Sequence, residues 1–197
     1  MIIDHLSQTI QLKICYFGPA LSGKTTTLKS LFKHFGKEDR VLSIDSSIRR
    51  TLFFDYGTIT FENKQWLLKL HLYSTTGQDF YIITRPITLR AIDGIIFVAD
   101  LQNSAYYRNL TSWNELCNYF EDDFEKIPKI LAFNKQDLED KFSTSEFLEN
   151  INSFKYNNLK TKNTAALYGE GVVESFEELL ELILKKIYKT QMISLVE

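Results

Sequence analysis

Residues 18–25 read GPALSGKT, which fits the pattern G-x-x-x-x-G-K-[ST] of a phosphate-binding loop. A strand-like run from Ile10 to Phe17 precedes this stretch, and a helix-forming segment from Lys24 to Phe35 follows it. Glycines let backbone N–H groups turn inward around a phosphate, and a helix N-terminus adds partial positive charge there. The stretch therefore predicts a polyphosphate site inside a βα unit. A glycine-rich turn with an exposed lysine is the alternative interpretation.

Strand-like and helix-like segments alternate along the rest of the chain. Further strands are expected over residues 56–62, 66–73, 94–100, 129–134 and 159–163, and further helices over 103–120 and 143–151. The apolar runs 94–100 and 129–134 are typical of parallel strands that helices cover on both faces. The pair 56–62 and 66–73 suits a hairpin. We therefore expect one α/β domain over residues 1–197, with three layers and a six-stranded, mostly parallel sheet that has one antiparallel edge strand.

A final helix is indicated by apolar residues at helical spacing. They are Phe176, Leu179, Leu180, Ile183, Leu184 and Ile187. Acidic residues precede basic ones along the same segment, as the helix dipole favours. We interpret the stripe as core packing.

A second motif, NKQD at residues 134–137, closes the expected strand 129–134. The carboxylate of Asp137 can accept hydrogen bonds from both N1–H and the 2-amino group of guanine, and adenine offers no such pair of donors. Selection for guanine follows because the wrong base leaves that carboxylate unpaired. Asn134 is expected to tie this loop to the phosphate-binding loop, and the stem of Lys135 is expected to lie over the base. The backbone of Ala166, in the segment 164–167, is expected to donate to guanine O6.

Two intervening segments can sense a terminal phosphate. Thr51 can place a hydroxyl on Mg²⁺ beside that of Thr25, while Lys24 bridges phosphate oxygens. Gly77 can bring an N–H to the terminal phosphate, and Gln78 can orient the attacking water. Both segments would lose their contacts once GTP becomes GDP.

The composition narrows the classes of partner. A formal net charge of -2 offers no basic excess for nucleic acid or an anionic membrane. The sequence shows no signal-peptide pattern and none of the usual lipid-anchor motifs, so we expect a cytoplasmic protein without a direct membrane anchor. Cys15 and Cys117 have no second ligand at metal spacing and are expected to be buried thiols.

Several segments together resemble the MglA-like small GTPases of bacteria and archaea, which are more distantly related to Ras-like and Arf-like proteins. The segments are residues 13–26, RTLFFD at 50–55, HLY at 71–73, GQ at 77–78 and DGIIFVAD at 93–100. The resemblance implies a Ras-like fold and a Mg²⁺-dependent GTPase switch. In that family an arginine before the switch threonine acts as an intrinsic arginine finger, which points to Arg50 beside Gln78. A roadblock-domain regulator is the implied partner.

The sequence departs from the related patterns at two positions. Ser74 stands where most Ras-like proteins have an aspartate that holds a Mg²⁺-bound water. MglA-like proteins also lack this aspartate. Ala20 stands where MglA-like proteins usually carry glycine. Its methyl group would point toward the space that the arginine and glutamine need, so slow hydrolysis is expected without an activating partner.

The expected site residues fall into three groups. The catalytic candidates are Lys24, Arg50 and Gln78, and the metal ligands are Thr25 and Thr51. The residues expected to bind GTP or GDP are Gly18, Ala20, Leu21, Ser22, Gly23, Lys24, Thr25, Thr26, Thr51, Gly77, Asn134, Lys135, Asp137, Ala165, Ala166 and Leu167.

Two alternatives to a hydrolysing switch remain open at this level. One is a GTP-binding interaction module with negligible hydrolysis, and the other is a P-loop kinase for a small metabolite. The NKQD motif and the lack of an arginine-rich lid segment count against the kinase. The effector, the exchange factor and a possible homodimer are not specified by the sequence.

Overall fold

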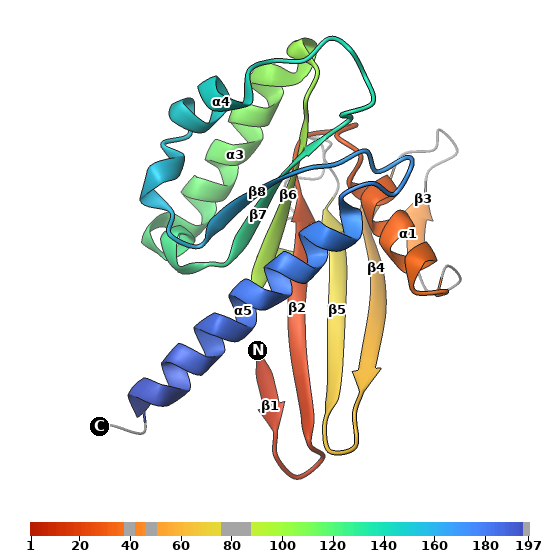
Figure 1. Cartoon of the computed structure of the whole chain (residues 1–197), viewed down its shortest axis with the longest axis vertical. Helices are drawn as coiled ribbons and strands as arrows, with labels where there is room; N and C mark the ends of the chain where they lie inside the picture. Colours follow the sequence, from red (N-terminus) through yellow and green to blue (C-terminus); the bar gives the residue numbers. More distant parts are fainter. Residues whose placement is uncertain (38–41, 46–50, 76–87, 195–197) are drawn as a thin grey trace.

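The computed structural model describes residues 1–37, 42–45, 51–75 and 88–194, and these form a sheet between two layers of helices (Figure 1). The strands are β1 (Ile2–Asp4), β2 (Thr9–Phe17), β3 (Leu42–Asp45), β4 (Thr51–Glu62), β5 (Leu67–Thr75), β6 (Gly94–Asp100), β7 (Lys129–Asn134) and β8 (Leu159–Asn163). The α-helices are α1 (Lys24–His34), α3 (Tyr106–Phe120), α4 (Thr144–Asn150) and α5 (Val172–Ser194). Short 3₁₀ helices are η3 (Asn103–Ala105), η4 (Glu121–Lys126) and η5 (Ser153–Lys155).

The strand order is β3-β4-β5-β2-β6-β7-β8, with β1 paired to β2. The strands β5, β2, β6, β7 and β8 run parallel, whereas β4 is antiparallel to β5 and β3 is antiparallel to β4. The α/β class and all six expected strands are confirmed. The expected strand count is wrong, because the described residues alone form a sheet of eight strands, and β4 is not at the edge because β3 pairs with its outer side. The two additional strands have only three and four residues, too few for periodicity to reveal them.

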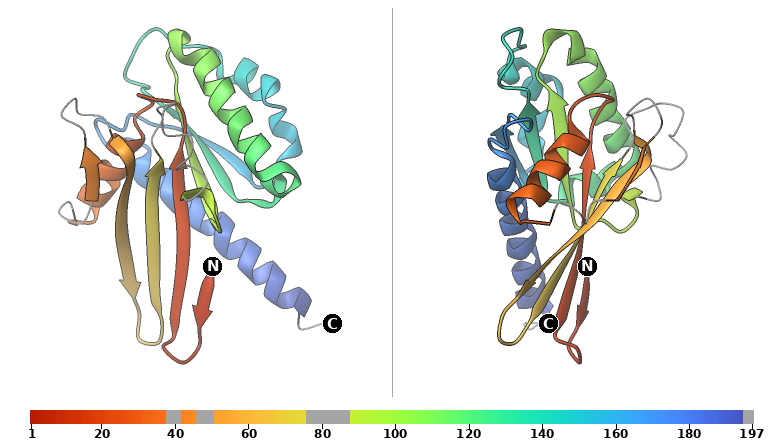
Figure 2. Two further views of the ribbon diagram at one scale, coloured as in Figure 1. Left: turned by 180° about the vertical axis from the view of Figure 1, so that it is seen from behind. Right: turned by 90° about the vertical axis from the view of Figure 1, so that its right-hand side faces the viewer.

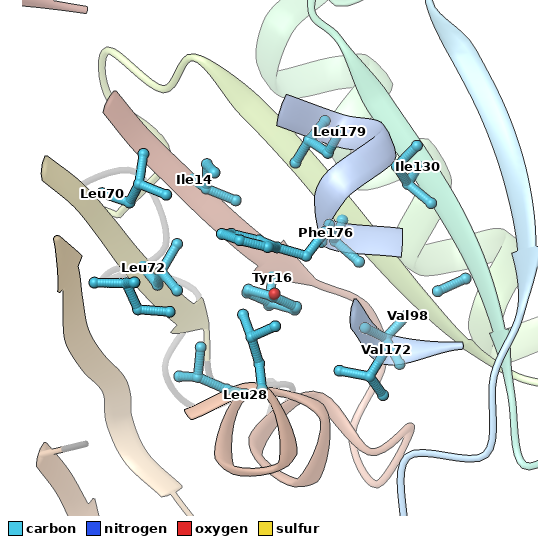
Figure 3. Packing of buried hydrophobic residues seen from close by; sticks show 14 of the residues in the cluster. Ile14, Tyr16, Leu28, Leu70, Leu72, Val98, Ile130, Val172, Phe176 and Leu179 are labelled. Atoms are coloured by element: carbon cyan, nitrogen blue, oxygen red, sulfur yellow. The ribbon is translucent and has the colours of Figure 1, made fainter. Parts of the chain in front are cut away.

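Helices cover the two faces of the sheet (Figure 2). On one face, α1 and α5 enclose a cluster that includes Tyr16, Leu28, Leu72 and Phe176 (Figure 3). On the other face, α3 and α4 enclose a second cluster around Trp113. Successive residues of β2 alternate between these clusters, as the period of a strand requires.

The last helix follows the predicted stripe with one exception. Phe176, Leu179 and Ile183 are buried, and Leu180 and Ile187 are partly buried against the same cluster. Leu184 remains 47% exposed, so its assignment to the core is wrong. No helix in the described ranges is long and apolar enough to cross a membrane.

The parallel strands place their carboxyl ends together. β2 ends in the loop that leads to α1, and β6 and β7 end beside it at Asp100 and Asn134. Ligands of open α/β sheets bind outside such carboxyl ends. Of the candidate residues, those in the loop 18–25 and those in the turn that begins at Asn134 therefore lie together at the carboxyl ends of the strands.

Candidate functional site

The loop between β2 and α1 is shaped by two glycines. Gly18 and Gly23 have φ values of 144° and 100°, which side-chain-bearing residues rarely adopt. A Cβ atom at Gly18 would lie 2.3 Å from the carbonyl oxygen of Val98, and one at Gly23 would lie 2.2 Å from Asn134 Nδ2. Both positions therefore require glycine, on conformational and steric grounds.

Lys24 is the first residue of α1, and its amine points back into the loop. Its Nζ donates to the carbonyl oxygens of Gly18 at 2.9 Å and Pro19 at 2.7 Å. The side chain is buried, so its charge acts in a surrounding of low dielectric constant. The other loop residues of the prediction occupy the same turn: Ala20 is half-buried, Leu21 is exposed, Ser22 is buried and Thr26 is exposed at the start of α1.

A carboxylate that we did not predict lies beside Thr25. Thr25 Oγ1 donates a 2.6 Å hydrogen bond to Asp55 Oδ2, although the two residues belong to α1 and β4. Asp55 is fully buried, and its Oδ1 has no hydrogen-bond partner in the described part of the chain. Asp55 also pairs directly with Ser74 across β4 and β5, and the buried Ser74 Oγ likewise lacks a described partner. Buried polar atoms without partners are rare, and these two oxygens are chemically suited to bind an ion or a water.

Asn134 joins three segments of the site. Its Nδ2 donates to Ser22 O at 2.8 Å, 112 residues away in the chain. Its Oδ1 accepts from the Thr164 hydroxyl at 3.1 Å and from the Ala166 N–H at 3.0 Å. The prediction that Asn134 ties its loop to the phosphate-binding loop is confirmed. A guanine O6 at the Ala166 N–H would share that donor with Asn134 as a bifurcated bond.

The residues after Asn134 form a turn with an unusual backbone. Lys135 has a φ of 69°, and its Nζ forms a 2.7 Å ion pair with the buried Asp100 Oδ2. The N–H of Gln136 donates to Thr164 O at 3.1 Å, which holds the turn against the segment 164–167. Asp137 is exposed at the end of this turn. The turn thus presents a carboxylate at the same sheet edge as the phosphate-binding loop.

The segment 164–167 follows β8 and approaches α1. Ala165 and Ala166 are buried, while Leu167 is 72% exposed. The N–H of Ala165 donates to Glu170 O at 3.0 Å, which closes the loop before α5. Asn134 therefore brings the predicted base-reading residues and the predicted phosphate-gripping residues together.

Of the four predicted switch residues, the structure describes only Thr51. Thr51 is the first residue of β4, where it pairs with Asp45 of β3. Arg50, Gly77 and Gln78 lie outside the described residues. Their roles remain predictions.

Two residues of the candidate site, Asp55 and Asp100, were not predicted from the sequence. Asp55 ends the distinctive RTLFFD segment, but only the register of β4 against β5 reveals that it faces Ser74. Asp100 ends an apolar strand in the same way that Asn134 does, and this shared position was the available signal. A polar residue at the carboxyl end of a buried parallel strand is a candidate for the site.

The buried Cys15 of β2 is not suited to act as a nucleophile. Burial raises the pKa of the Cys15 thiol to about 12, and the charges of Lys13 and Lys24 oppose this only in part. A neutral thiol is neither a nucleophile nor a metal ligand. Both cysteines are free; Cys15 is buried as expected, whereas Cys117 is only half-buried.

This chain is similar to known proteins of one family over most of its length. The family model described as "Ras family" matches residues 13–185. The mutual gliding-motility protein MglA of Myxococcus xanthus is 32% identical over 95% of this chain and 97% of its own length. Rab-32D of Dictyostelium discoideum is 27% identical over 92% of this chain and 74% of its own length, and human Rab-4A is 29% identical over 89% and 75%.

Proposed function

Because this chain belongs to the Ras family of small GTPases and is MglA-like, we propose that it binds GTP and GDP with Mg²⁺, hydrolyses GTP, and acts as a nucleotide-controlled switch. The observation that carries the proposal is the Asn134 side chain. Its hydrogen bonds to Ser22 O and to the Ala166 N–H fix the phosphate-binding loop and the base-reading loop relative to each other. One nucleotide can then be held at both ends.

The phosphates are assigned to the loop 18–25 and the start of α1. The N–H groups of this loop and of the first turn of α1 offer donors to phosphate oxygens, and the left-handed glycines permit the tight turn that exposes them. The buried amine of Lys24 supplies a positive charge inside the loop. Charge-assisted hydrogen bonds of this kind are about twice as strong as neutral ones.

Magnesium fits the oxygen atoms around Thr25. Mg²⁺ prefers hydroxyl, carboxylate and water oxygens, and Thr25 Oγ1, Asp55 and Ser74 Oγ supply the first two kinds. The unpartnered Oδ1 of Asp55 suits a water held on the ion, the role that an aspartate at position 74 has in most Ras-like proteins. Asp55 thus supplies from β4 the carboxylate that β5 lacks. Mg²⁺ held by these oxygens would neutralise charge on the phosphate oxygens.

Guanine is assigned to the turn 134–137. The exposed carboxylate of Asp137 accepts from N1–H and the 2-amino group, and the ion pair of Lys135 with Asp100 fixes the lysine stem at the same turn. A base without two adjacent donors leaves Asp137 unpaired. This pairing provides the selection of guanine over adenine.

Hydrolysis is assigned to Gln78, Arg50 and Thr51 by family resemblance. Gln78 orients water, Arg50 stabilises charge on the phosphate oxygens, and Thr51 completes the metal ligands. An arginine in this role is worth about 10³ to 10⁵ in rate. Because Ala20 places a methyl group in the loop, the intrinsic rate is slow, and a roadblock-type regulator aligns the arginine and the glutamine.

The base assignment is tested by Asp137→Asn. An asparagine offers an amide donor where the carboxylate accepted, so it fits the 2-oxo group of xanthine in place of the 2-amino group of guanine. Titration should show at least about tenfold weaker binding of GDP and stronger binding of XDP, with Asp140→Asn as the matched surface control. Equal binding of ADP and GDP by the unaltered protein would contradict the assignment.

The hydrolysis assignment needs a separate measurement. Single-turnover GTP hydrolysis should be slow alone and faster with a roadblock-type regulator, and Arg50→Ala or Gln78→Leu should abolish the difference. A rate in the unaltered protein no higher than in these variants, with and without the regulator, would instead identify a GTP-binding interaction module.

A further inference from the structure

A cavity of about 400 Å³ lies between α1 and the loop that leads from β8 to α5. Figure 1 shows this loop running across to α1. The described residues that line the cavity are Thr26, Lys29, Ser30, Lys33, Ala166, Leu167, Tyr168 and Gly169. Three of these, Thr26, Ala166 and Leu167, belong to the proposed nucleotide site.

The shared residues show which part of a nucleotide the cavity adjoins. Thr26 follows the phosphate-binding loop, whereas Ala166 belongs to the base-reading loop. The sugar of a nucleotide connects its phosphates to its base. If one nucleotide spans the two loops as proposed, a cavity that touches both Thr26 and Ala166 would adjoin its ribose.

One wall of the cavity carries an uncompensated positive charge. Lys29 and Lys33 are one helical turn apart on α1, so their Cβ atoms lie about 5–6 Å apart and both side chains can converge on one anion. No acidic residue occurs in α1, and none is among the described residues that line the cavity. Neither lysine has an ion-pair partner in the part of the chain that the structure describes. Like charges at this spacing destabilise a helix unless an anion offsets them.

The cavity also has polar groups suited to phosphate oxygens. Ser30 contributes a hydroxyl to the wall, close to the Gly169 backbone of the opposite loop. Tyr168 is 67% exposed at the rim and adds a second hydroxyl. The two ammonium groups and the two hydroxyls can all donate hydrogen bonds to an anion. A neutral ribose hydroxyl would not require two positive charges beside it.

We propose that this cavity binds additional phosphate on the ribose of a guanine nucleotide, so that the protein prefers guanosine 5′-diphosphates that are also phosphorylated at the 2′ or 3′ oxygen. Lys29 and Lys33 supply the charge, and Ser30 supplies a hydroxyl donor. Such a ligand would hold the protein in a state without a terminal 5′ phosphate. This inference rests on the proposed guanine-nucleotide site and adds a second anion subsite to it.

The test compares the affinity of the full chain for three nucleotides by calorimetric titration in the presence of Mg²⁺. The nucleotides are GDP, guanosine 5′-diphosphate 3′-diphosphate and guanosine 5′-diphosphate 2′-phosphate. We expect at least one ribose-phosphorylated nucleotide to bind about tenfold more tightly than GDP, and the difference to shrink as salt screens the lysines. Equal affinity for all three nucleotides would overturn the proposal.

Variants separate this subsite from the nucleotide site itself. The double variant Lys29→Gln, Lys33→Gln keeps helix-forming side chains, so it should bind GDP as before and lose the preference for extra phosphate. The matched control Lys64→Gln, Lys69→Gln removes the same charge near the β4–β5 turn, at the other end of the sheet, and should keep the preference (Figure 1). A preference that survives in the Lys29, Lys33 variant also overturns the proposal. Failure to bind GDP at all would instead count against the proposed function.

A last arm separates ribose-borne phosphate from free anions. Inorganic pyrophosphate is titrated into the GDP-bound protein. We expect no saturable binding in the range where the ribose-phosphorylated nucleotide binds. Pyrophosphate binding of equal strength would show a general anion pocket and overturn the link to the ribose.

Discussion

Asp55 and Ser74 face each other across the antiparallel pair β4 and β5, and Asp55 accepts a 2.6 Å hydrogen bond from Thr25. A carboxylate on either strand therefore reaches the same place beside α1. This relationship explains how the proposed magnesium site manages without an aspartate at position 74.

The variant Asp55→Asn should bind Mg²⁺ more weakly and should therefore release GDP faster in the presence of Mg²⁺. Groups that hold a metal through water typically contribute about 10- to 100-fold in metal affinity. Release of a fluorescent GDP should accelerate by about that factor in Mg²⁺, and the variant and the unaltered protein should release it equally fast in excess chelator. Adding Ser74→Asp to the variant should restore slow release, because the new carboxylate faces the same space. Unchanged release in Asp55→Asn would disprove the role, and Asp123→Asn serves as the surface control.

The variant Asn134→Ala should destabilise the protein even without nucleotide. It removes the hydrogen bonds to Ser22 O, the Thr164 hydroxyl and the Ala166 N–H, and leaves these buried groups with fewer partners. The free energy of unfolding should fall by about 2 kcal/mol or more. Urea unfolding of the nucleotide-free protein measures this. The exposed Asn103→Ala should cost less than about 0.5 kcal/mol, and an equal cost for both variants would contradict the prediction.

Lys129 should make stability depend on pH. Its side chain is buried at the start of β7 between the rings of Phe124 and Tyr156, at 4.6 and 4.9 Å from their centroids. Burial lowers its pKa from 10.5 to about 7; nearby Cys117 and Glu125 oppose the shift and Lys186 adds to it. Between these pH values the unfolded chain binds more protons, so the free energy of unfolding rises with pH by up to about 1.4 kcal/mol per unit.

The variant Lys129→Met isolates this effect. Relative to the variant, the unaltered protein should gain about 2 kcal/mol of stability between pH 7 and 9. Unfolding in urea at several pH values measures the difference, in which the titration of other groups cancels. Below pH 7 the difference should level off. An identical pH dependence in both proteins would show that Lys129 keeps an ordinary pKa; the exposed Lys126→Met is the control.

A side chain at Gly57 should destabilise the protein while Phe32 is present. A Cβ atom at Gly57 would lie 2.4 Å from Phe32 Cζ, where α1 packs on β4. Gly57→Ala should therefore lower the free energy of unfolding by about 1–3 kcal/mol. The double variant Gly57→Ala, Phe32→Leu should lose at least about 0.5 kcal/mol less stability than the sum of the losses in the two single variants, because the shorter side chain at residue 32 frees space. Strict additivity in urea unfolding would contradict this packing.

The sequence predicts the elements whose signal is local. The loop 18–25 and the turn 134–137 are contiguous motifs, and β6 and β7 contain the apolar runs that are typical of buried parallel strands. The link through Asn134 follows from the fold that these motifs specify. These features need no knowledge of long-range register.

The remaining features depend on pairing between distant segments. The role of Asp55 arises from the register of β4 against β5, and the ion pair of Lys135 with Asp100 joins the ends of two strands. The strands β1 and β3 are too short to show a period and form by pairing with longer neighbours. Leu184 fits the helical stripe, yet it lies on a part of α5 that the core does not cover.

The amide side chain of Asn134 bridges the phosphate-binding loop and the proposed base-reading loop. The two loops therefore depend on the same side chain for their relative position. A regulator that displaced this amide would loosen both loops together, whereas a displacement of one loop alone would be opposed by its hydrogen bonds to Asn134. Accelerated exchange should therefore behave as one all-or-none step.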